Sequence, residues 1–430
     1  MKRNPQILIL GLTALFVFQA QAESIYTLDE CVAIGLKRAV PVLNAARDQK
    51  IAEASMKQAR ATGLPQIELS ATYTRNDGTG SSFITNDVLR DSYSGSVTAS
   101  QTLYNGGKVF SGIRAAKAYR GLTAEAQAQQ EAALIRNIHF GFNGILLAQA
   151  NVAVQEASVK QLTDFTEQTE QKFEVGTASE FDHLTAQVRL ANEKPKLVEA
   201  NNELAIAKER FRNLIVLEEE EFALNGDLDY APFDPDLTAL QIDALNARPE
   251  LLVQKKTVAL RREDLKSSWS SYKPVVTADA IYTYENPDRY DVGSNDQWAE
   301  HWQAGITAKW TLFDGGTRRG EVLTKGLELA KAEAIRDELL RAVSLDVKSA
   351  WLDMLAARET IVGTSDNVKL AEKALDIAKA RTDAGLSTYL EFTDSNLSLN
   401  TARLIPFQAL EKHLSAVAQL KYAAGILGEK

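Results

Sequence analysis

The chain contains the same pattern twice, and this duplication constrains its fold more than any other feature of the sequence. The segment QTLYNGG at 101–107 recurs as WTLFDGG at 310–316, an offset of 209 residues. The same offset relates two prolines, two helix-ending glycines and a series with seven-residue spacing: Pro65 and Pro274, Gly176 and Gly385, and Ile138, Ile145, Val152 and Val159 with Val347, Met354, Ile361 and Val368. The period is too long for a solenoid repeat, so each half is expected to be one unit of several elements.

Each half is predicted to consist, in chain order, of a helix, two strands, a long helix and a return helix. The long helices are expected at about 108–175 and 317–384, where seven-residue spacing of apolar residues is typical of coiled-coil packing. A helix of that length would extend about 100 Å at 1.5 Å per residue. Glycines suit left-handed helix ends, so the return helices are expected at about 179–217 and 388–427. The sequence therefore predicts two antiparallel helical hairpins.

Four shorter segments alternate apolar and polar residues, and they are predicted to be strands. They cover about 65–75, 93–104, 274–284 and 302–313. Aromatic residues lie near their ends: Tyr73, Tyr104, Tyr282, Tyr284, Trp302, Trp310 and Phe313. This length and alternation match strands that cross a bilayer in a barrel, although a one-sided sheet packed on a helix remains an alternative. Four strands are too few to close a barrel, so two copies sharing it would supply eight strands and three would supply twelve.

The N-terminus resembles a cleaved secretory signal over residues 1–22. Lys2 and Arg3 precede an apolar run at 7–18, and Ala20-Gln-Ala22 offers the small residues of a cleavage site. An uncleaved anchor is the alternative. Cys31 lacks the small-residue context of a lipidated cysteine and is interpreted as a buried apolar thiol, so the mature chain is expected not to be lipidated. As the single cysteine, it also excludes a disulfide scaffold.

Composition excludes several further classes. The net charge of -9 argues against nucleic-acid binding, which requires a basic surface.

The domain organisation follows from the duplication. Residues 23–217 and 237–430 are interpreted as the two structural repeats, joined by an acidic linker or equatorial segment at 218–236. No phosphate loop, zinc-protease helix or serine-hydrolase elbow occurs, so no enzyme activity, cofactor or metal site is predicted. The scattered histidines are interpreted as helix-surface or loop residues: His139, His183, His301 and His413.

Taken together, these features resemble the TolC-type outer membrane factor family. They are the signal, the duplicated unit, the glycine-containing helix turns, and the LYNGG and LFDGG elements at 103–107 and 312–316. The resemblance covers essentially the whole mature chain. It implies a mainly α-helical homotrimer in which four strands per protomer build a shared twelve-stranded barrel in outer-membrane lipid, continued by helices through the periplasm. It also implies the exit duct of a tripartite efflux or type I secretion system of Gram-negative bacteria, docked through a periplasmic adaptor onto an inner-membrane transporter.

The resemblance places a closable mouth at the tips of the helical hairpins. Asp182, Glu391 and Asp394 match the acidic aperture positions of the family, and three copies would form carboxylate rings that favour cations. The alternative is that these acids serve as ordinary favourable charges at helix N-termini. The usual latch positions hold Thr382 and Ser387 here, with Lys172 and Arg381 nearby as substitutes.

Two further sets of residues follow from the resemblance. The adaptor is expected to contact the helix turns, namely Val175, Gly176, Thr177, Gly385, Leu386 and Ser387, although helix capping alone would also explain these residues. The passages between sheet and helices are expected at Pro65, Gly106, Gly107, Pro274, Gly315 and Gly316.

Two other functions are compatible with parts of the pattern. A coiled-coil surface or adhesion protein would keep the helices but would not need membrane-length strands. A periplasmic hydrolase would need a nucleophile and base that the sequence does not display. The cargo, the pump and the resting state of the mouth are not encoded in these patterns.

Overall fold

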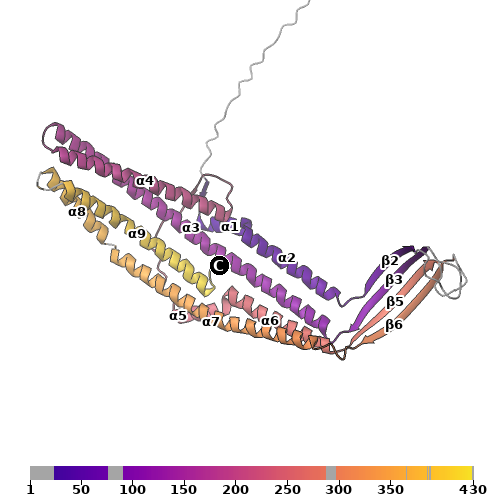
Figure 1. Cartoon of the computed structure of the whole chain (residues 1–430). Helices are drawn as coiled ribbons and strands as arrows, with labels where there is room; N and C mark the ends of the chain where they lie inside the picture. The colour runs from indigo at the N-terminus through magenta and orange to yellow at the C-terminus, as the bar shows by residue number, and fades with distance from the viewer. Residues whose placement is uncertain are drawn as a thin grey trace, which may run out of the picture.

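A computed structural model describes residues 24–75, 91–286, 297–364, 366–384, 386 and 389–428. The chain is elongated, with a four-stranded sheet at one end and long helices running away from it to two helical tips at the other (Figure 1). The proposed signal peptide, 1–22, lies outside the described residues, as do most of the two connections between paired strands.

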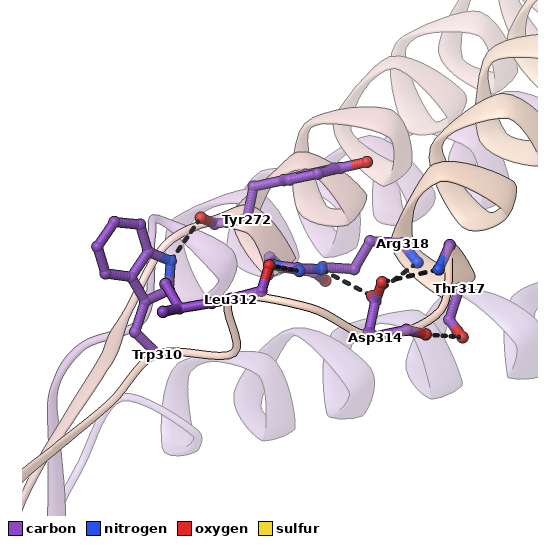
Figure 2. Close-up of polar contacts among 8 residues, drawn as sticks. Tyr272, Trp310, Leu312, Asp314, Thr317 and Arg318 are labelled. Atoms are coloured by element: carbon purple, nitrogen blue, oxygen red, sulfur yellow. Dashed lines mark hydrogen bonds and ion pairs between the residues drawn. The ribbon is translucent and has the colours of Figure 1, made fainter.

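The sheet is antiparallel throughout, in the order β2-β3-β5-β6. Its strands are β2 (Gln66–Arg75), β3 (Asp91–Tyr104), β5 (Val275–Asn286) and β6 (Ala299–Lys309). Each repeat therefore contributes one pair of strands. The fourth strand ends earlier than the predicted 302–313, which leaves Trp310 and Phe313 beyond it. The Trp310 indole N–H donates to the Tyr272 carbonyl at 3.1 Å, which ties this segment to the helical body instead of the sheet (Figure 2).

The strand pairing places the alternating apolar and polar residues of all four strands in matching rows across the sheet. Leu69 pairs with Val97, Val97 with Tyr282, and Tyr282 with Trp302, so one face carries a continuous apolar row. The neighbouring row on the opposite face is polar, with a hydrogen bond between the Ser70 and Ser96 hydroxyls at 2.8 Å. Within the described residues, β2 and β6 are edge strands, so the sheet is open on both sides.

Shorter helices begin each repeat and keep the 209-residue offset. They are α1 (Leu28–Arg38) and α2 (Val40–Ala61) in the first repeat, and α5 (Leu237–Ala247) and α6 (Pro249–Trp269), followed by the 3-10 turn η1 (Ser270–Tyr272), in the second. Within the predicted linker 218–236, β4 (Phe222–Leu224) pairs in parallel with β1 (Ser24–Tyr26). Phe222 is buried, so this part of the acidic segment packs onto the first repeat.

The long helices differ between the repeats. The first repeat has α3 (Lys108–Glu174), 67 residues without interruption, and α4 (Glu180–Ile215). The second has α7 (Thr317–Thr364), α8 (Asn367–Asp383) and α9 (Tyr389–Ala424). The prediction of one continuous helix over 317–384 is therefore wrong. Residues 363–366, Gly-Thr-Ser-Asp, are weak helix formers, and the Thr364 hydroxyl donates to the carbonyls of Thr360 and Ile361.

The predicted seven-residue series forms the core at equivalent positions. Ile138 and Val347 are fully buried, as are Ile145 and Met354, each pair separated by the 209-residue offset. Cys31 is buried as expected, and burial raises the pKa of its thiol to about 11. The interpretation of His413 as a surface residue is wrong, because its ring is fully buried with Nε2 3.2 Å from the Ala231 carbonyl oxygen.

Among the helices of the described segments, none combines the length and the apolar character that crossing a bilayer as a helix requires.

Candidate functional site

Each passage from the sheet to a long helix contains two consecutive glycines whose backbone angles lie in the left-handed region. Gly106 and Gly107 have φ of 68° and 94°, and Gly315 and Gly316 have 66° and 96°. A Cβ on Gly106 would lie 2.8 Å from the Ser270 carbonyl oxygen, so the first repeat approaches the second closely here. At the opposite passages, Pro65 and Pro274 immediately precede β2 and β5.

The second passage is reinforced by an Asp–Arg pair that sequence reasoning missed. The Asp314 carboxylate accepts hydrogen bonds from the backbone N–H groups of Gly316 and Arg318 and from the Arg318 guanidinium at 2.7 Å (Figure 2). The Arg318 backbone N–H is the main cause that holds the Asp314 pKa below its ordinary value. Arg318 also donates to the Leu312 carbonyl and lies over the Tyr272 ring. An Asp followed four residues later by an Arg at a helix start was the available sequence signal.

The first hairpin tip, between α3 and α4, is a closely bonded turn. The Lys172 carbonyl accepts from the backbone N–H groups of Thr177 and Ala178, at 2.7 and 3.1 Å, and from the Thr177 hydroxyl. Gly176 has φ of 78°. The turn leaves Val175 75% exposed at the end of the molecule.

The second hairpin tip, between α8 and α9, repeats the central bond of the first. The Leu386 N–H donates to the Arg381 carbonyl at 2.8 Å, and the Arg381 guanidinium lies 3.4 Å from the Leu386 carbonyl oxygen. Thr382 is buried, and its hydroxyl donates to Ala378 in its own helix. Gly385 and Ser387 lie outside the described residues, so the proposed latch and adaptor residues are only partly described.

The three proposed aperture acids have different surroundings. Asp182 forms a capping box with Ser179: its carboxylate accepts from the Ser179 hydroxyl at 2.6 Å, and its N–H donates back to that hydroxyl. This contact matches the alternative of a helix-end acid. Glu391 occupies the equivalent position of the second repeat, and both Glu391 and Asp394 are exposed near the start of α9.

A buried polar cluster between the two hairpins was not predicted. Asn400 on α9 donates to the Ser158 hydroxyl on α3 at 2.6 Å, and Ser158 donates to the Glu193 carboxylate on α4 at 2.8 Å. All three residues are buried. A serine between apolar residues of a coiled-coil helix was the only sequence signal. Across the described residues, no group of three or more His, Cys, Asp or Glu is placed to hold a metal ion.

Comparison with known proteins gives consistent matches over both repeats. The family model for the outer membrane efflux protein family matches residues 35–215 and 240–426. The chain is 26% identical over 400 residues to the outer membrane protein TolC of Vibrio cholerae, covering 90% of this chain and 88% of that protein. It is 22% identical over 389 residues to the alkaline protease secretion protein AprF of Pseudomonas aeruginosa, covering 87% and 80%.

Solved structures show the same fold. The outer membrane channel CmeC of Campylobacter jejuni superposes with a TM-score of 0.82 at 16% identity, covering 93% of this chain and 85% of that one. The outer membrane protein VceC of Vibrio cholerae gives a TM-score of 0.78 at 18% identity, covering 93% and 96%. The chain therefore belongs to the outer membrane efflux protein family, a family of channels, and serves as an outer-membrane exit duct.

Proposed function

We propose that the protein works as a homotrimer whose three sheets close into one barrel in the Gram-negative outer membrane. The open sheet, whose edge strands β2 and β6 have no further strand beside them within the described residues, is the observation that carries this proposal. Because β2, β3, β5 and β6 alternate in direction, β6 of one copy can pair antiparallel with β2 of the next. Three copies would give twelve strands, wide enough to enclose a pore and leave no edge exposed to lipid.

The two faces of the sheet support this arrangement. The face with Leu69 and Trp302, each 79% exposed in the single chain, suits lipid, and the face with Ser70 and Ser96 suits a water-filled lumen. Near the end of the sheet away from the helices, the rings of Tyr73 and Tyr93 contact each other in a tilted arrangement, with centroids 5.0 Å apart. Such aromatic groups are typical of the interfacial girdle of a barrel.

The helices would continue the barrel into the periplasm and meet the partners there. An adaptor and an inner-membrane transporter are proposed partners, since AprF is named for protease secretion and other relatives are efflux channels. The exposed Val175 and Leu386 at the two tips are the proposed adaptor contacts. Cleavage of residues 1–22 and the absence of a lipid anchor belong to the same proposal.

The mouth is proposed to close at the tips, with Glu391 and Asp394 providing the acidic rings. Asp182 is the third proposed aperture acid, and its carboxylate also accepts hydrogen bonds in the cap of α4. Lys172 and Arg381, which hold equivalent positions in the two repeats, are the proposed polar contacts of the closed mouth.

Fractionation and conductance test this function directly. The full chain is expressed in a Gram-negative host, separated into soluble periplasmic and outer-membrane fractions, purified in detergent, and added to planar lipid bilayers. We expect outer-membrane localisation, a cross-linked species of three chains, and stepwise cation-preferring currents. Release of the protein with the soluble periplasmic contents, or bilayers without current, would contradict the proposal.

A further inference from the structure

The helix ends beside the sheet carry an excess of basic residues, although the chain as a whole has a net charge of -9. Residues 108–122, at the start of α3, contain four basic side chains and no acidic one. Residues 255–269, at the end of α6, contain five basic and two acidic side chains. Charge of one sign, gathered against the net charge of the chain, favours a negatively charged partner at this level.

Six basic side chains near the ends of three helices that meet the sheet form what we call the basic belt (Figure 1): Lys57 and Arg60 on α2, Lys117 and Arg120 on α3, and Arg262 and Lys266 on α6. All six residues are exposed. Arg262 pairs with Glu333 at 3.3 Å. Lys266 pairs with Glu263, a carboxylate that also contacts Arg114. The other four have no ion pair within the described residues, so the belt keeps an excess of positive charge.

The belt lies on the outer side of the helices. On α3, Lys117 precedes Ile138 by three heptads and therefore shares its face of the helix. Helix α1 covers that face further along, since a Cβ on Gly35 would lie 2.7 Å from the Ile138 side chain. In the proposed trimer, three copies of α1 inside the tube would obstruct its lumen. The face shared by Ile138 and Lys117 is therefore the outer one.

Aromatic side chains mark the level at which the belt meets the sheet. Trp269 and Trp310 are more than half exposed, and the ring of Trp269 contacts that of Tyr272 with centroids 5.5 Å apart. Tryptophan and tyrosine concentrate at the interface between membrane and water. Lys266 precedes Trp269 by three residues on the same face of α6. The belt thus begins about one helical turn from the expected membrane surface, at the depth of lipid headgroups.

The apolar face of the sheet contains a groove of about 520 Å³, which we call the alanine groove; its lining includes Ala99, Ala278, Ala280 and Ala304. Ala99 pairs with Ala280, and Ala280 pairs with Ala304, so three of these small residues form one row across the sheet. The next row on the same face holds the large side chains of Tyr282 and Trp302. The groove is therefore a depression bordered by aromatic rings.

The depth of the alanine groove matches the periplasmic half of the bilayer. Ala280 lies five residues into β5 from Val275, about 17 Å along the strand. For a strand tilted by 35–45°, this is about 13 Å along the membrane normal. Half of the hydrocarbon core is about 15 Å thick. An acyl chain whose headgroup lies at the belt would therefore reach the groove.

We propose that the basic belt and the alanine groove together bind an anionic phospholipid of the periplasmic leaflet. Its phosphate lies among the belt side chains, and one acyl chain lies in the groove. The long Lys and Arg side chains extend toward the headgroups while their stems cover the helix surface. This inference rests on the proposed barrel, which places the apolar face of the sheet in lipid.

Native mass spectrometry of the full-length protein purified in detergent tests this binding, because it resolves the trimer and counts the lipids attached to it. The probes are dioleoyl phosphatidylglycerol and dioleoyl phosphatidylethanolamine, which share acyl chains and differ in headgroup charge. We expect phosphatidylglycerol to bind about ten-fold more tightly at low ionic strength. Raising the ammonium acetate concentration should reduce this preference, because salt screens exposed charges.

The combined variant Lys57→Gln, Lys117→Gln and Lys266→Gln removes one belt cation from each helix. Its affinity for phosphatidylglycerol should fall about ten-fold, and its affinity for phosphatidylethanolamine should not change. The matched control removes the same charge from exposed positions on α3, α4 and α8 away from the sheet: Lys160→Gln, Lys194→Gln and Lys379→Gln. The control should keep the preference for phosphatidylglycerol.

Ala280→Phe tests the groove separately from the belt. The added ring fills the alanine groove, so binding of both lipids should weaken by a similar factor while the preference for phosphatidylglycerol remains. Unchanged binding of both lipids in this variant would overturn the placement of the acyl chain.

Equal affinity of the original trimer for the two lipids, or equal losses in the belt and control variants, would overturn the inference. This is also the result expected if the belt contacts a periplasmic protein or a cell-wall polymer instead. A trimer that conducts but shows no lipid preference leaves the proposed function intact. A protein that forms no trimer would contradict the proposed function itself.

Discussion

The two helical hairpins have the same origin in the duplicated sequence but differ in stiffness. The first combines the uninterrupted α3 with a tip closed by the Ser179–Asp182 capping box. The second is divided between α7 and α8 and carries the exposed acids Glu391 and Asp394. A proline does not distinguish the two hairpins, because both return helices contain one, Pro195 in α4 and Pro406 in α9. Their buried core positions remain equivalent, so the difference arises from a few local residues and not from a different architecture.

The largest expected effect tests the equivalence of the two cores. Ile145→Ala and Met354→Ala each remove a fully buried side chain at matching positions. We expect each variant to lower the free energy of unfolding by about 2–5 kcal/mol, measured by denaturant titration in detergent. Lys348→Ala, on the exposed side of α7, serves as a near-neutral control. A loss below about 1 kcal/mol at only one of the two core sites would break the equivalence.

A smaller effect should separate the two glycine turns at the sheet. Gly106→Ala and Gly315→Ala both place a side chain at positive φ, which costs about 1–2 kcal/mol. Only at Gly106 does the added Cβ also collide with the Ser270 carbonyl, because nothing lies within 4 Å of the equivalent position on Gly315. Gly106→Ala should therefore destabilise the protein more in the same titration. Equal losses would show that the close approach of the repeats at Gly106 is not maintained in solution.

The next prediction concerns the cap of the first tip. Ser179→Ala removes the capping box and should cost about 1 kcal/mol locally, which would speed hydrogen exchange in the first turn of α4. The first turn of α9 should exchange as before. Ser398→Ala, whose hydroxyl bonds only to the Asp394 carbonyl in its own helix, is the control. Unchanged exchange in α4 would mean that Asp182 is free to act at the aperture.

The smallest effect is a dependence on pH at the second passage from sheet to helix. The pKa of Asp314 is lowered in the folded protein, mainly by the Arg318 backbone N–H, so its stabilising contribution is present above the unfolded pKa and is lost as pH falls through the lowered value. Exchange at 314–318, corrected for intrinsic rates, should therefore increase at acidic pH. The equivalent turn at 105–109 has Asn105, which does not titrate. Asp314→Asn should abolish the difference, and its persistence would assign it to another group.

The sequence predicted those parts of the fold that depend on periodicity. Seven-residue spacing identified Ile138 and Val347 as core residues, because it reflects burial of one helix face. Two-residue alternation located the four strands, because it separates an apolar face of the sheet from a polar one. The gap after Thr364 was missed, since a few weak helix formers rarely end a helix whose neighbours are strongly periodic. The early end of β6 was missed for a related reason: the hydrogen bond from Trp310 to Tyr272 is tertiary.

The candidate site was less accessible to sequence reasoning. The capping box at Ser179 and Asp182 is a local pattern, and the alternative of a helix-end acid anticipated it. Asn400 and Ser158 are far apart in the chain, and no spacing rule connects them. Only the packing of α9 on α3 brings this pair together in the buried cluster.

The reversal potential of the Glu391→Gln, Asp394→Asn double variant in a salt gradient tests the central claim most directly. If the second hairpin carries the selective mouth of an exit duct, the original protein should prefer cations, and the double variant should lose most of that preference while still forming trimers and conducting. Asp243→Asn, an exposed acid on α5, should leave the reversal potential unchanged. A double variant with the reversal potential of the original protein would contradict the assignment of the mouth to Glu391 and Asp394.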